Sequence, residues 1–354
     1  MFRVCIDILR EKIKRKKMTL DLSVVSDLEG VSEEISHDDS IFSCKKKDSQ
    51  NSQDINILGS GSGDSIKILH ASEDKAKDSK LYITKVLPLN SCQNKKEYNF
   101  YSKKIYSEAL PNIMDIRLNA DRSLGYVTMM WYAGKSPSLE NIQGIVRAIN
   151  GYCDTFYPNR NFVKILFGSC LTLLKTMYRK PLKGDVSNIC SWLDIAPSRY
   201  FLSFFLRAHV YLFWSAENKT TGVSVVQEID AALSRVNRCK YRMGLVHGEL
   251  HIGNVLEFNN DIKVVDWSSY FYGPVMLDLA RLLHARIGWD ELEKNVLPSV
   301  SKENNFSHAD RVLLVCIMMS YWITRRPKNA MDNTMFEDLF KAKKWLRVQN
   351  MMNE

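Results

Sequence analysis

The chain falls into two parts that differ in the period of their hydrophobic residues. In the first part, short runs of alternating apolar and polar residues are separated by Gly, Ser, Asp or Lys, a pattern typical of β-strands in hairpins. The expected strands are residues 55–58, 66–69, 81–87 and 126–132. Helical spacing interrupts them between Lys95 and Ile105. This pattern predicts a small β-rich lobe over residues 53–134.

Beyond residue 134 the apolar residues recur mainly at helical spacing. The expected helices are residues 139–149, 200–214, 225–236, 306–325 and 335–348. Two short β-like runs, 245–246 and 262–265, break this pattern. Residues 135–354 are therefore expected to form a larger, mostly helical lobe. The predicted fold class is α+β, with two lobes.

Residues 1–52 have a different composition. From Ser32 to Gln53 the chain is rich in Ser, Asp, Glu, Lys and Asn and has few large apolar residues, which favours disorder. A basic cluster precedes it at residues 10–17. We predict a basic and polar tail. A solvated tail, a chain that begins at Met18, and a short amphipathic helix in weak contact with an anionic membrane all fit this pattern.

The overall composition is that of a globular protein. The chain has 354 residues, of which 45% are hydrophobic, enough to bury a core. Its eight cysteines form no CxxC pair, which favours a reducing compartment and predicts a cytoplasmic location. The first twenty residues lack the pattern of a signal peptide. The longest apolar run, Val312 to Ile323, is too short to cross a bilayer.

The formal net charge of +9 is partly local. It is concentrated in the basic cluster at residues 10–17 and in Lys45 to Lys47. No basic motif with interleaved aromatic residues of the kind that binds single strands is present, so nucleic acid is not an expected partner. The sequence does not indicate the oligomeric state.

The most informative polar residues follow the two β-like runs of the second part. Glu249 and Asn254 lie in the loop after Leu245-Val246, and Asp266 ends the run that begins at Ile262. Phosphoryl transfer from ATP needs a carboxylate near the acceptor hydroxyl and oxygen ligands that hold Mg²⁺ against the phosphates. Glu249 fits the first role, and Asn254 and Asp266 fit the second.

The loop His247-Gly-Glu-Leu-His-Ile-Gly-Asn254 resembles the His-Gly-Asp-Leu-His-x-Gly-Asn loop of the aminoglycoside phosphotransferase and choline kinase superfamily. Val265-Asp266-Trp267 and the segment 273–283 continue the resemblance. It implies a protein-kinase-like fold, ATP and Mg²⁺ as cofactors, and transfer of the γ-phosphate to a hydroxyl group. Glu249 stands where the family has its catalytic Asp, and this departure bears on turnover rather than on fold.

The resemblance also implies roles for residues of the first lobe. A glycine-rich turn would cover the phosphates, a lysine inside an apolar strand would contact them and pair with Glu97, and the end of the last strand would lie near adenine. The predicted ATP site comprises Gly59, Ser60, Gly61, Ser62, Gly63, Lys85, Glu97, Met130, Trp131 and Tyr132. A plain hairpin turn and a snorkelling edge-strand lysine are the alternative interpretations of these motifs.

Two residues resemble the family's structural support of the catalytic loop. His247 is expected to brace the fold through hydrogen bonds, and Asp278 to tie down the backbone of the loop. His251 is also interpreted as structural. Arg281 and His284 are expected on the surface of the helix that follows Asp278.

The short distance between Asp266 and Asp278 bears on the acceptor. Asp278 lies only twelve positions after Asp266, and no Ala-Pro-Glu-like anchor lies between them, which leaves little platform for a peptide. This favours a small hydroxylated acceptor, such as an aminoglycoside, an amino alcohol or a sugar. Asp290, Glu291 and Glu293 are candidates for holding a cationic acceptor. An atypical protein kinase and a non-catalytic nucleotide-binding protein are the alternatives, the latter because of Glu249.

Overall fold

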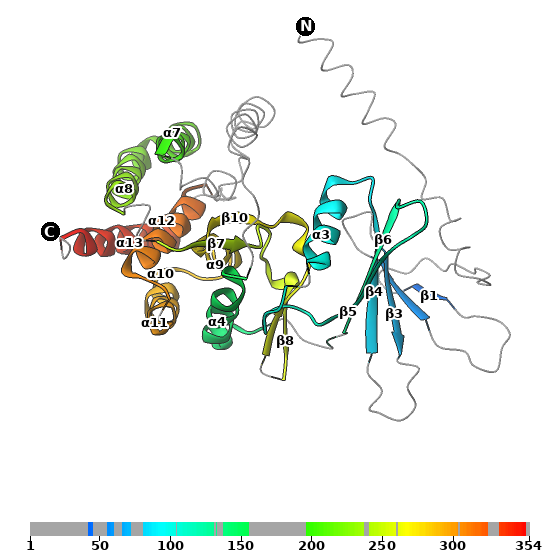
Figure 1. Ribbon diagram of the computed structural model, residues 1–354. Coiled ribbons are helices and arrows are strands. Elements are labelled where there is room, and N and C mark those ends of the chain that lie inside the picture. Colours follow the sequence, from blue (N-terminus) through cyan, green and yellow to red (C-terminus); the bar gives the residue numbers. More distant parts are fainter. Residues whose placement is uncertain are drawn as a thin grey trace, which may run out of the picture.

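The computed structural model has a lobe built on one β-sheet and a larger lobe that is mostly helical (Figure 1). The chain is described at residues 42–44, 55–59, 66–71, 81–103, 105–130, 132, 137–155, 196–236, 241–259, 261–303, 305–324 and 333–351. The predicted α+β class with two lobes is confirmed. Of the predicted tail at residues 1–52, all but residues 42–44 lies outside the described residues.

The first lobe contains a six-stranded sheet with antiparallel neighbours. In sequence order its strands are β1 (Phe42–Cys44), β2 (Ile55–Gly59), β3 (Ile66–Ala71), β4 (Leu81–Pro88), β5 (Ile113–Leu118) and β6 (Leu124–Met130). Their order in the sheet is β1-β2-β3-β4-β6-β5. The predicted strands are all present, with small shifts of their ends.

Two strands of this sheet were not expected from the sequence. The edge strand β5 has exposed or half-buried residues throughout, so its sequence carries no alternation of apolar and polar positions. β1 lies within the segment predicted to be a disordered tail and pairs with β2, so the sheet begins earlier along the chain than expected.

The helix α3 (Cys92–Ser102) lies between the sheet and the second lobe (Figure 1). It begins three residues before the predicted start at Lys95 and ends before Ile105. Its buried side chains include Glu97, Phe100 and Tyr101. This helix therefore places one carboxylate and two aromatic rings at the junction of the lobes.

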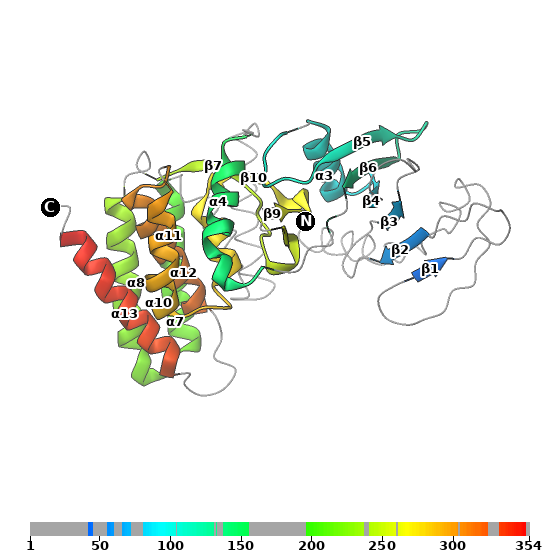
Figure 2. The same ribbon diagram turned by 90° about the horizontal axis from the view of Figure 1, so that it is seen from below.

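The second lobe is built from helices that pack side by side (Figure 2). They are α4 (Ile142–Cys153), α7 (Ala196–Phe213), α8 (Ala216–Arg235), α9 (Met276–Leu283), α10 (Trp289–Glu291), α11 (Leu297–Lys302), α12 (His308–Thr324) and α13 (Asn333–Met351). The helix α12 is buried along most of its length and forms the centre of this lobe. In the described part of the chain, no helix is both long and apolar enough to span a membrane.

Two small antiparallel sheets carry the loops of the second lobe. Strand β7 (Met243–Val246) pairs with β10 (Phe271–Pro274), and β8 (Val255–Phe258) pairs with β9 (Asp261–Val264). The predicted catalytic loop leaves the end of β7 and leads into β8. The turn with Asp266 joins β9 to β10, so both predicted motifs are anchored at strand ends.

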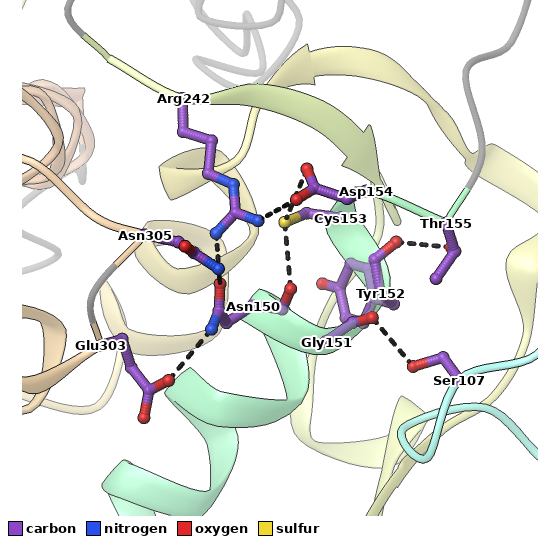
Figure 3. Close-up of polar contacts among 10 residues, drawn as sticks. All are labelled: Ser107, Asn150, Gly151, Tyr152, Cys153, Asp154, Thr155, Arg242, Glu303 and Asn305. Carbon is purple, nitrogen blue, oxygen red and sulfur yellow. Dashed lines mark hydrogen bonds and ion pairs between the residues drawn. The ribbon is translucent and has the colours of Figure 1, made fainter.

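A polar cluster at Arg242 fixes the opposite end of β7 (Figure 3). Its guanidinium donates hydrogen bonds to Asn150 and Asp154 at the end of α4, and its backbone N–H donates to Asp310 Oδ1 at 2.6 Å. Asn150 in turn donates to Glu303 Oε2 at 3.0 Å. Strand β7, which leads into the predicted catalytic loop, is thereby connected by hydrogen bonds to α4 and α12, and through Asn150 to the segment after α11.

Three cysteines lie in the described part with their side chains, and all are free thiols. Cys92 is exposed at the start of α3, whereas Cys153 and Cys316 are buried in the second lobe. Burial raises the pKa of Cys153 to about 12 and raises that of Cys316 further. These two thiols are protonated and shielded in the folded protein.

Candidate active site

The two lobes meet in an ion-pair cluster centred on Lys85. Its Nζ lies 2.7 Å from both carboxylate oxygens of Glu97 and 3.3 Å from Oδ1 of Asp266. Lys85 and Glu97 are almost completely buried, while the Asp266 side chain is 39% exposed. Burial lowers the pKa of Lys85, but the charges of Glu97 and Asp266 outweigh it and raise the pKa overall. The predicted pairing of Lys85 with Glu97 is confirmed.

The turn that carries Asp266 is held by an aromatic stack. Asp266 has left-handed backbone angles, φ 67° and ψ 62°, which an Asp tolerates better than most residues. The next residue, Trp267, is fully buried and stacks on Phe100 of α3 with ring centroids 4.5 Å apart. Tyr152 and His247 contact Trp267 edge-on at 4.9 and 4.8 Å. The stack thus connects the turn to both lobes.

Asp278 fixes the backbone of the catalytic loop, as the sequence predicts. Its carboxylate accepts hydrogen bonds from the backbone N–H of His247 at 2.7 Å and of Gly248 at 3.1 Å, and from the Tyr152 hydroxyl at 2.7 Å. Complete burial raises its pKa to about 6, against the opposing effect of these hydrogen bonds. Gly248 has φ +84°, and a Cβ there would come within 2.5 Å of the Ser269 carbonyl oxygen.

His247 has the structural role that the sequence predicts. The ring is fully buried; its Nε2 lies 2.9 Å from the Val265 carbonyl oxygen, and its Nδ1 accepts a hydrogen bond from the Glu249 N–H at 3.2 Å. Burial lowers its pKa to about 4, so the ring is neutral at pH 7. His247 therefore links the strand before Asp266 to the backbone of Glu249.

The geometry of Asn254 is compatible with a hard cation. Its side-chain nitrogen donates to the Glu249 carbonyl oxygen at 3.1 Å, which leaves the amide oxygen as its ligand atom. Its backbone oxygen accepts from the Val265 N–H at 3.0 Å, next to Asp266. One amide oxygen and one carboxylate suit Mg²⁺, which keeps waters and phosphate oxygens as its other ligands.

The remaining predicted ATP-site residues are placed only in part. Gly59 is the last residue of β2 and Met130 the last of β6. Ser60, Gly61, Ser62, Gly63 and Trp131 lie outside the described residues. Tyr132 is buried, and its hydroxyl accepts a hydrogen bond from the Asn112 N–H at 3.1 Å. The backbone N–H of Met130 also bonds to the Asn112 carbonyl oxygen, at 3.0 Å.

The structure corrects the interpretation of α9. Arg281 and His284 were expected on the surface, but Arg281 donates a hydrogen bond to the Gly248 carbonyl oxygen and His284 stacks on Tyr321 of α12 with centroids 4.1 Å apart. Both side chains are half-buried. These contacts join segments that are distant along the chain, so no local pattern of residues predicts them.

The acidic residues proposed for a cationic acceptor take part in local contacts. Both Asp290 oxygens accept hydrogen bonds from Lys341 Nζ, at 2.9 and 3.0 Å. Glu291 accepts from Asn295, and Glu293 accepts from the indole N–H of Trp289. These three carboxylates support α10, the turn after it and α13.

Residues 194–298 match the model of the APH family, a phosphotransferase enzyme family. The match spans the catalytic loop, Asp266 and Asp278, which confirms the resemblance seen in the sequence. A comparison with curated proteins found no match.

Solved structures similar to this chain include an aminoglycoside phosphotransferase, APH(4)-Ia, with 13% identity, coverage of 93% of this chain and 96% of that chain, and a TM-score of 0.42. The amicoumacin kinase hAmiN, in complex with AMP-PNP, Ca²⁺ and Ami, has 12% identity, coverage of 96% of both chains and a TM-score of 0.41. A putative fructosamine-3-kinase from Haemophilus somnus has 12% identity, coverage of 86% and 92%, and a TM-score of 0.39.

Proposed function

We propose that the protein is an ATP- and Mg²⁺-dependent phosphotransferase that transfers the γ-phosphate to a hydroxyl group of a small molecule. The single observation that carries this proposal is the Lys85 cluster. One ammonium contacts a helix carboxylate of the first lobe and the carboxylate of the predicted metal ligand in the second lobe. The match of residues 194–298 to a phosphotransferase family supports it.

In the proposed reaction Lys85 binds the α- and β-phosphates and Glu97 fixes the lysine. Asn254 and Asp266 would hold Mg²⁺, which when bound would supply positive charge against the transferred phosphoryl group. Glu249 orients the acceptor hydroxyl and takes its proton as the new phosphate ester bond forms. The bond between the γ-phosphorus and the bridging oxygen of ATP breaks in the same step, and ADP leaves. The turn at Gly59–Gly63 covers the phosphates, and the chain from Met130 to Tyr132 lies near adenine.

We also propose that the two lobes have different roles in the reaction. Residues 53–134 bind the nucleotide, and residues 135–354 carry the catalytic loop, the metal ligands and the acceptor. A small acceptor is favoured because the segment after Asp266 is short and leaves no residues for a platform that could bind a peptide. The segment forms the turn Trp267–Ser269 and then β10, which pairs with β7. The proposed place of action is the cytoplasm, in keeping with the free thiols.

The test is Mg²⁺-dependent release of ADP from ATP over a panel of aminoglycosides, amino alcohols, sugars and a generic protein. Asp266→Asn is the control. Stimulation by one class of small acceptor that is lost in Asp266→Asn is the expected result. Stimulation by protein alone would instead indicate an atypical protein kinase, and its activation segment would then have to lie elsewhere in the chain.

A non-catalytic nucleotide-binding protein is the second candidate, and Glu249 is the observation that favours it. Its carboxylate stands one methylene further from the backbone than an Asp would. If Glu249→Asp gains turnover over an inactive wild type, the length of this side chain limits the reaction. If wild type and Glu249→Asp both bind ATP without releasing ADP for any acceptor, the protein is a nucleotide-binding one.

A further inference from the structure

Strand β5 forms an edge of the sheet in the first lobe. Of the strands that the structure describes, β5 and β1 stand at the two ends of the sheet, and β5 pairs with β6 on one side. Figure 2 shows β5 at the end of the sheet away from β1. The outer side of an edge strand presents a row of backbone N–H and C=O groups to which another strand can bind. The backbone of β5 can therefore accept one more strand.

Hydrogen bonds at both ends hold β5 in one extended conformation. After the strand, the Asn119 N–H donates to the Leu124 carbonyl oxygen at 3.1 Å, and Asn119 Oδ1 accepts from the Leu124 N–H at 2.9 Å. Before the strand, the Asn112 carbonyl oxygen accepts from the Met130 N–H at 3.0 Å. A strand that is already ordered loses little conformational freedom when a second strand binds to it.

The hydrogen bond of Asn119 fixes which backbone groups of β5 point outwards. In an antiparallel pair, successive residues direct their N–H and C=O groups alternately towards the neighbouring strand and away from it. Because the Asn119 N–H faces β6, the N–H groups of Arg117 and Asp115 face β6 as well. Those of Ile116 and Leu118 therefore point away from the sheet. The bulge of β5 lies before Asp115, so residues 115–118 keep a regular register.

The side chains of β5 are complementary to themselves about Ile116. Asp115 and Arg117 flank Ile116 on one face, with Arg117 Nε 3.9 Å from Asp115 Oδ2, and these side chains are 58% and 66% exposed. One residue further out on either side, Met114 and Leu118 are exposed hydrophobic residues. Reversing the strand about Ile116 exchanges an acid with a base and one apolar residue with another.

We propose that β5 pairs antiparallel with β5 of a second copy of this chain, about a two-fold axis at Ile116. One sheet then runs through the first lobes of both copies. The outward N–H and C=O groups of the two Ile116 residues bond to each other. Asp115 of each copy stands opposite Arg117 of the other, and Met114 stands opposite Leu118.

Electrostatics selects this register of the two strands. Opposite charges that face each other across an antiparallel pair are favourable, and like charges are unfavourable. A shift by two residues in one direction places Asp115 against Asp115, and a shift in the other direction places Arg117 against Arg117. A shift by one residue sets outward backbone groups against groups that already face β6. The register centred on Ile116 avoids both conflicts.

A second copy is the partner that this pattern favours. A two-fold interface uses the same surface twice, so the surface must be complementary to itself. Residues 114–118, Met-Asp-Ile-Arg-Leu, satisfy this condition. Edges that are protected against pairing often carry Lys or Pro, and β5 has neither.

The first test is analytical ultracentrifugation of the full chain over a wide range of protein concentrations. The variants are Asp115→Arg, Arg117→Asp and the double variant that exchanges the two charges. Arg147→Asp on α4 is the matched control, because its ion pair with Glu303 has the same N–O distance of 3.9 Å and its side chain is 69% exposed. Thermal unfolding verifies that each variant is folded.

The wild type is expected to dimerise with increasing concentration. Each single variant places two pairs of like charges opposite each other and is expected to raise the dissociation constant about tenfold or more. The double variant restores two pairs of opposite charges and is expected to dimerise nearly as well as wild type and Arg147→Asp. A wild type that stays monomeric at every concentration overturns the inference. Single variants that dimerise like wild type, or a double variant as weak as the single ones, overturn it too.

The second test measures amide hydrogen exchange in dilute and concentrated protein. The N–H groups of Ile116 and Leu118 are expected to exchange more slowly in the concentrated sample, whereas that of Arg117, which faces β6, exchanges equally in both. Leu118→Pro removes an outward N–H without taking a donor from β6 and is expected to weaken the dimer while the sheet persists. A dimer in which exchange at Ile116 is independent of concentration forms through another surface, which overturns the inference. Neither test uses a nucleotide or an acceptor, so the outcome is independent of the proposed function.

Discussion

Lys85 and Glu97 are buried to a degree that is unusual for charged residues. Taking two charges out of water is costly, and their attraction compensates for this only when the geometry is good. The geometry here is good, because Lys85 Nζ lies 2.7 Å from both oxygens of Glu97. Such a pair is better explained by a need to hold the lysine in one place than by a gain in stability.

This argument predicts different effects for single and double substitutions. Lys85→Met removes the ammonium that compensates the buried Glu97 carboxylate and is expected to lower the free energy of unfolding by about 3–5 kcal/mol. Lys85→Met combined with Glu97→Leu is expected to recover most of this loss without recovering nucleotide binding. Urea unfolding and the thermal shift by Mg²⁺ and AMP-PNP measure the two properties. A double variant as unstable as the single one would contradict the argument.

Two buried groups, Asp278 of α9 and His247 of the catalytic loop, change the free energy of unfolding in opposite directions as the pH changes. The pKa of Asp278 is raised from 3.8 to about 6, so between these values the folded protein holds a proton that the unfolded chain has released, and stability falls as pH rises. The pKa of His247 is lowered from 6.5 to about 4, so stability from this group is lost as pH falls below 6.5.

Asp278→Asn removes only the first of these effects. The free energy of unfolding at pH 7 minus that at pH 5 is therefore expected to be about 1 kcal/mol more positive in Asp278→Asn than in wild type. Urea unfolding at the two pH values measures this difference. The variant will also be less stable at both pH values, since an amide cannot accept all three hydrogen bonds; an unchanged difference would show that Asp278 does not titrate as inferred.

At the scale of elements, the stack of Phe100 on Trp267 connects the position of α3 to that of the Asp266 turn. Glu97 lies one helical turn before Phe100, and Asp266 is next to Trp267. Any shift of α3 relative to the turn must therefore disturb the rings and the Lys85 cluster together. The two lobes are expected to form the site as one unit, because the hydrophobic and charged contacts share the same two elements.

The catalytic loop depends on Gly248 for its shape. Gly248→Ala introduces a Cβ at φ +84° that would meet the Ser269 carbonyl oxygen at 2.5 Å, so we expect a loss of about 1–3 kcal/mol and of phosphoryl transfer. Gly151→Ala is the matched control: the nearest atom to its Cβ is Ser107 Oγ at 3.6 Å, and its helical position predicts a neutral or slightly stabilising effect. Equal effects in the two variants, measured by urea unfolding, would contradict this account.

Much of the fold was predictable where local periodicity carries the information. The strand with Lys85 and the helix with Glu97 were predicted from their periodicity, whereas the pairing of the two residues was implied by the family resemblance; the structure contains this pair. Strand β5 was missed because neither of its faces is buried. Arg281 was placed wrongly, on the helix surface, because its contact with Gly248 joins segments that are distant along the chain.

At the scale of the whole molecule, strand β9 of the second lobe holds the segment between α3 and β5 of the first lobe. Lys263 of β9 is 8% exposed and donates a hydrogen bond to the Glu108 carbonyl oxygen, and the Val264 N–H donates to Ala109 at 2.7 Å. The ring of Tyr132, after β6, lies 5.6 Å below the Lys263 ammonium. One lysine of the second lobe thus contacts both the segment between α3 and β5 and the residue Tyr132 after β6.

Lys263→Met is therefore expected to loosen the lobes relative to each other. It removes the donor to the Glu108 carbonyl in a partly buried hydrogen bond, a cost of about 1 kcal/mol. It is also expected to speed hydrogen exchange in the linker between α3 and β5 and to weaken nucleotide affinity. Lys341→Met on α13 is the control, since its exposed ion pair with Asp290 contributes little. Exchange in the linker at the wild-type rate would show that Lys263 does not hold the lobes.

Among the residues that the structure describes, three free thiols allow the opening of α3 and of the second lobe to be followed separately by chemical labelling. Cys92 on α3 is exposed and should react with an alkylating reagent in the native protein, at a rate that changes when α3 becomes less accessible. Cys153 and Cys316, buried and protonated, can react only after the second lobe opens. Mass spectrometry of the labelled peptides would thus give two independent alkylation rates. The rate at Cys92 reports on the interlobe helix, and the rates at Cys153 and Cys316 report on the helical core, without any substitution in the chain.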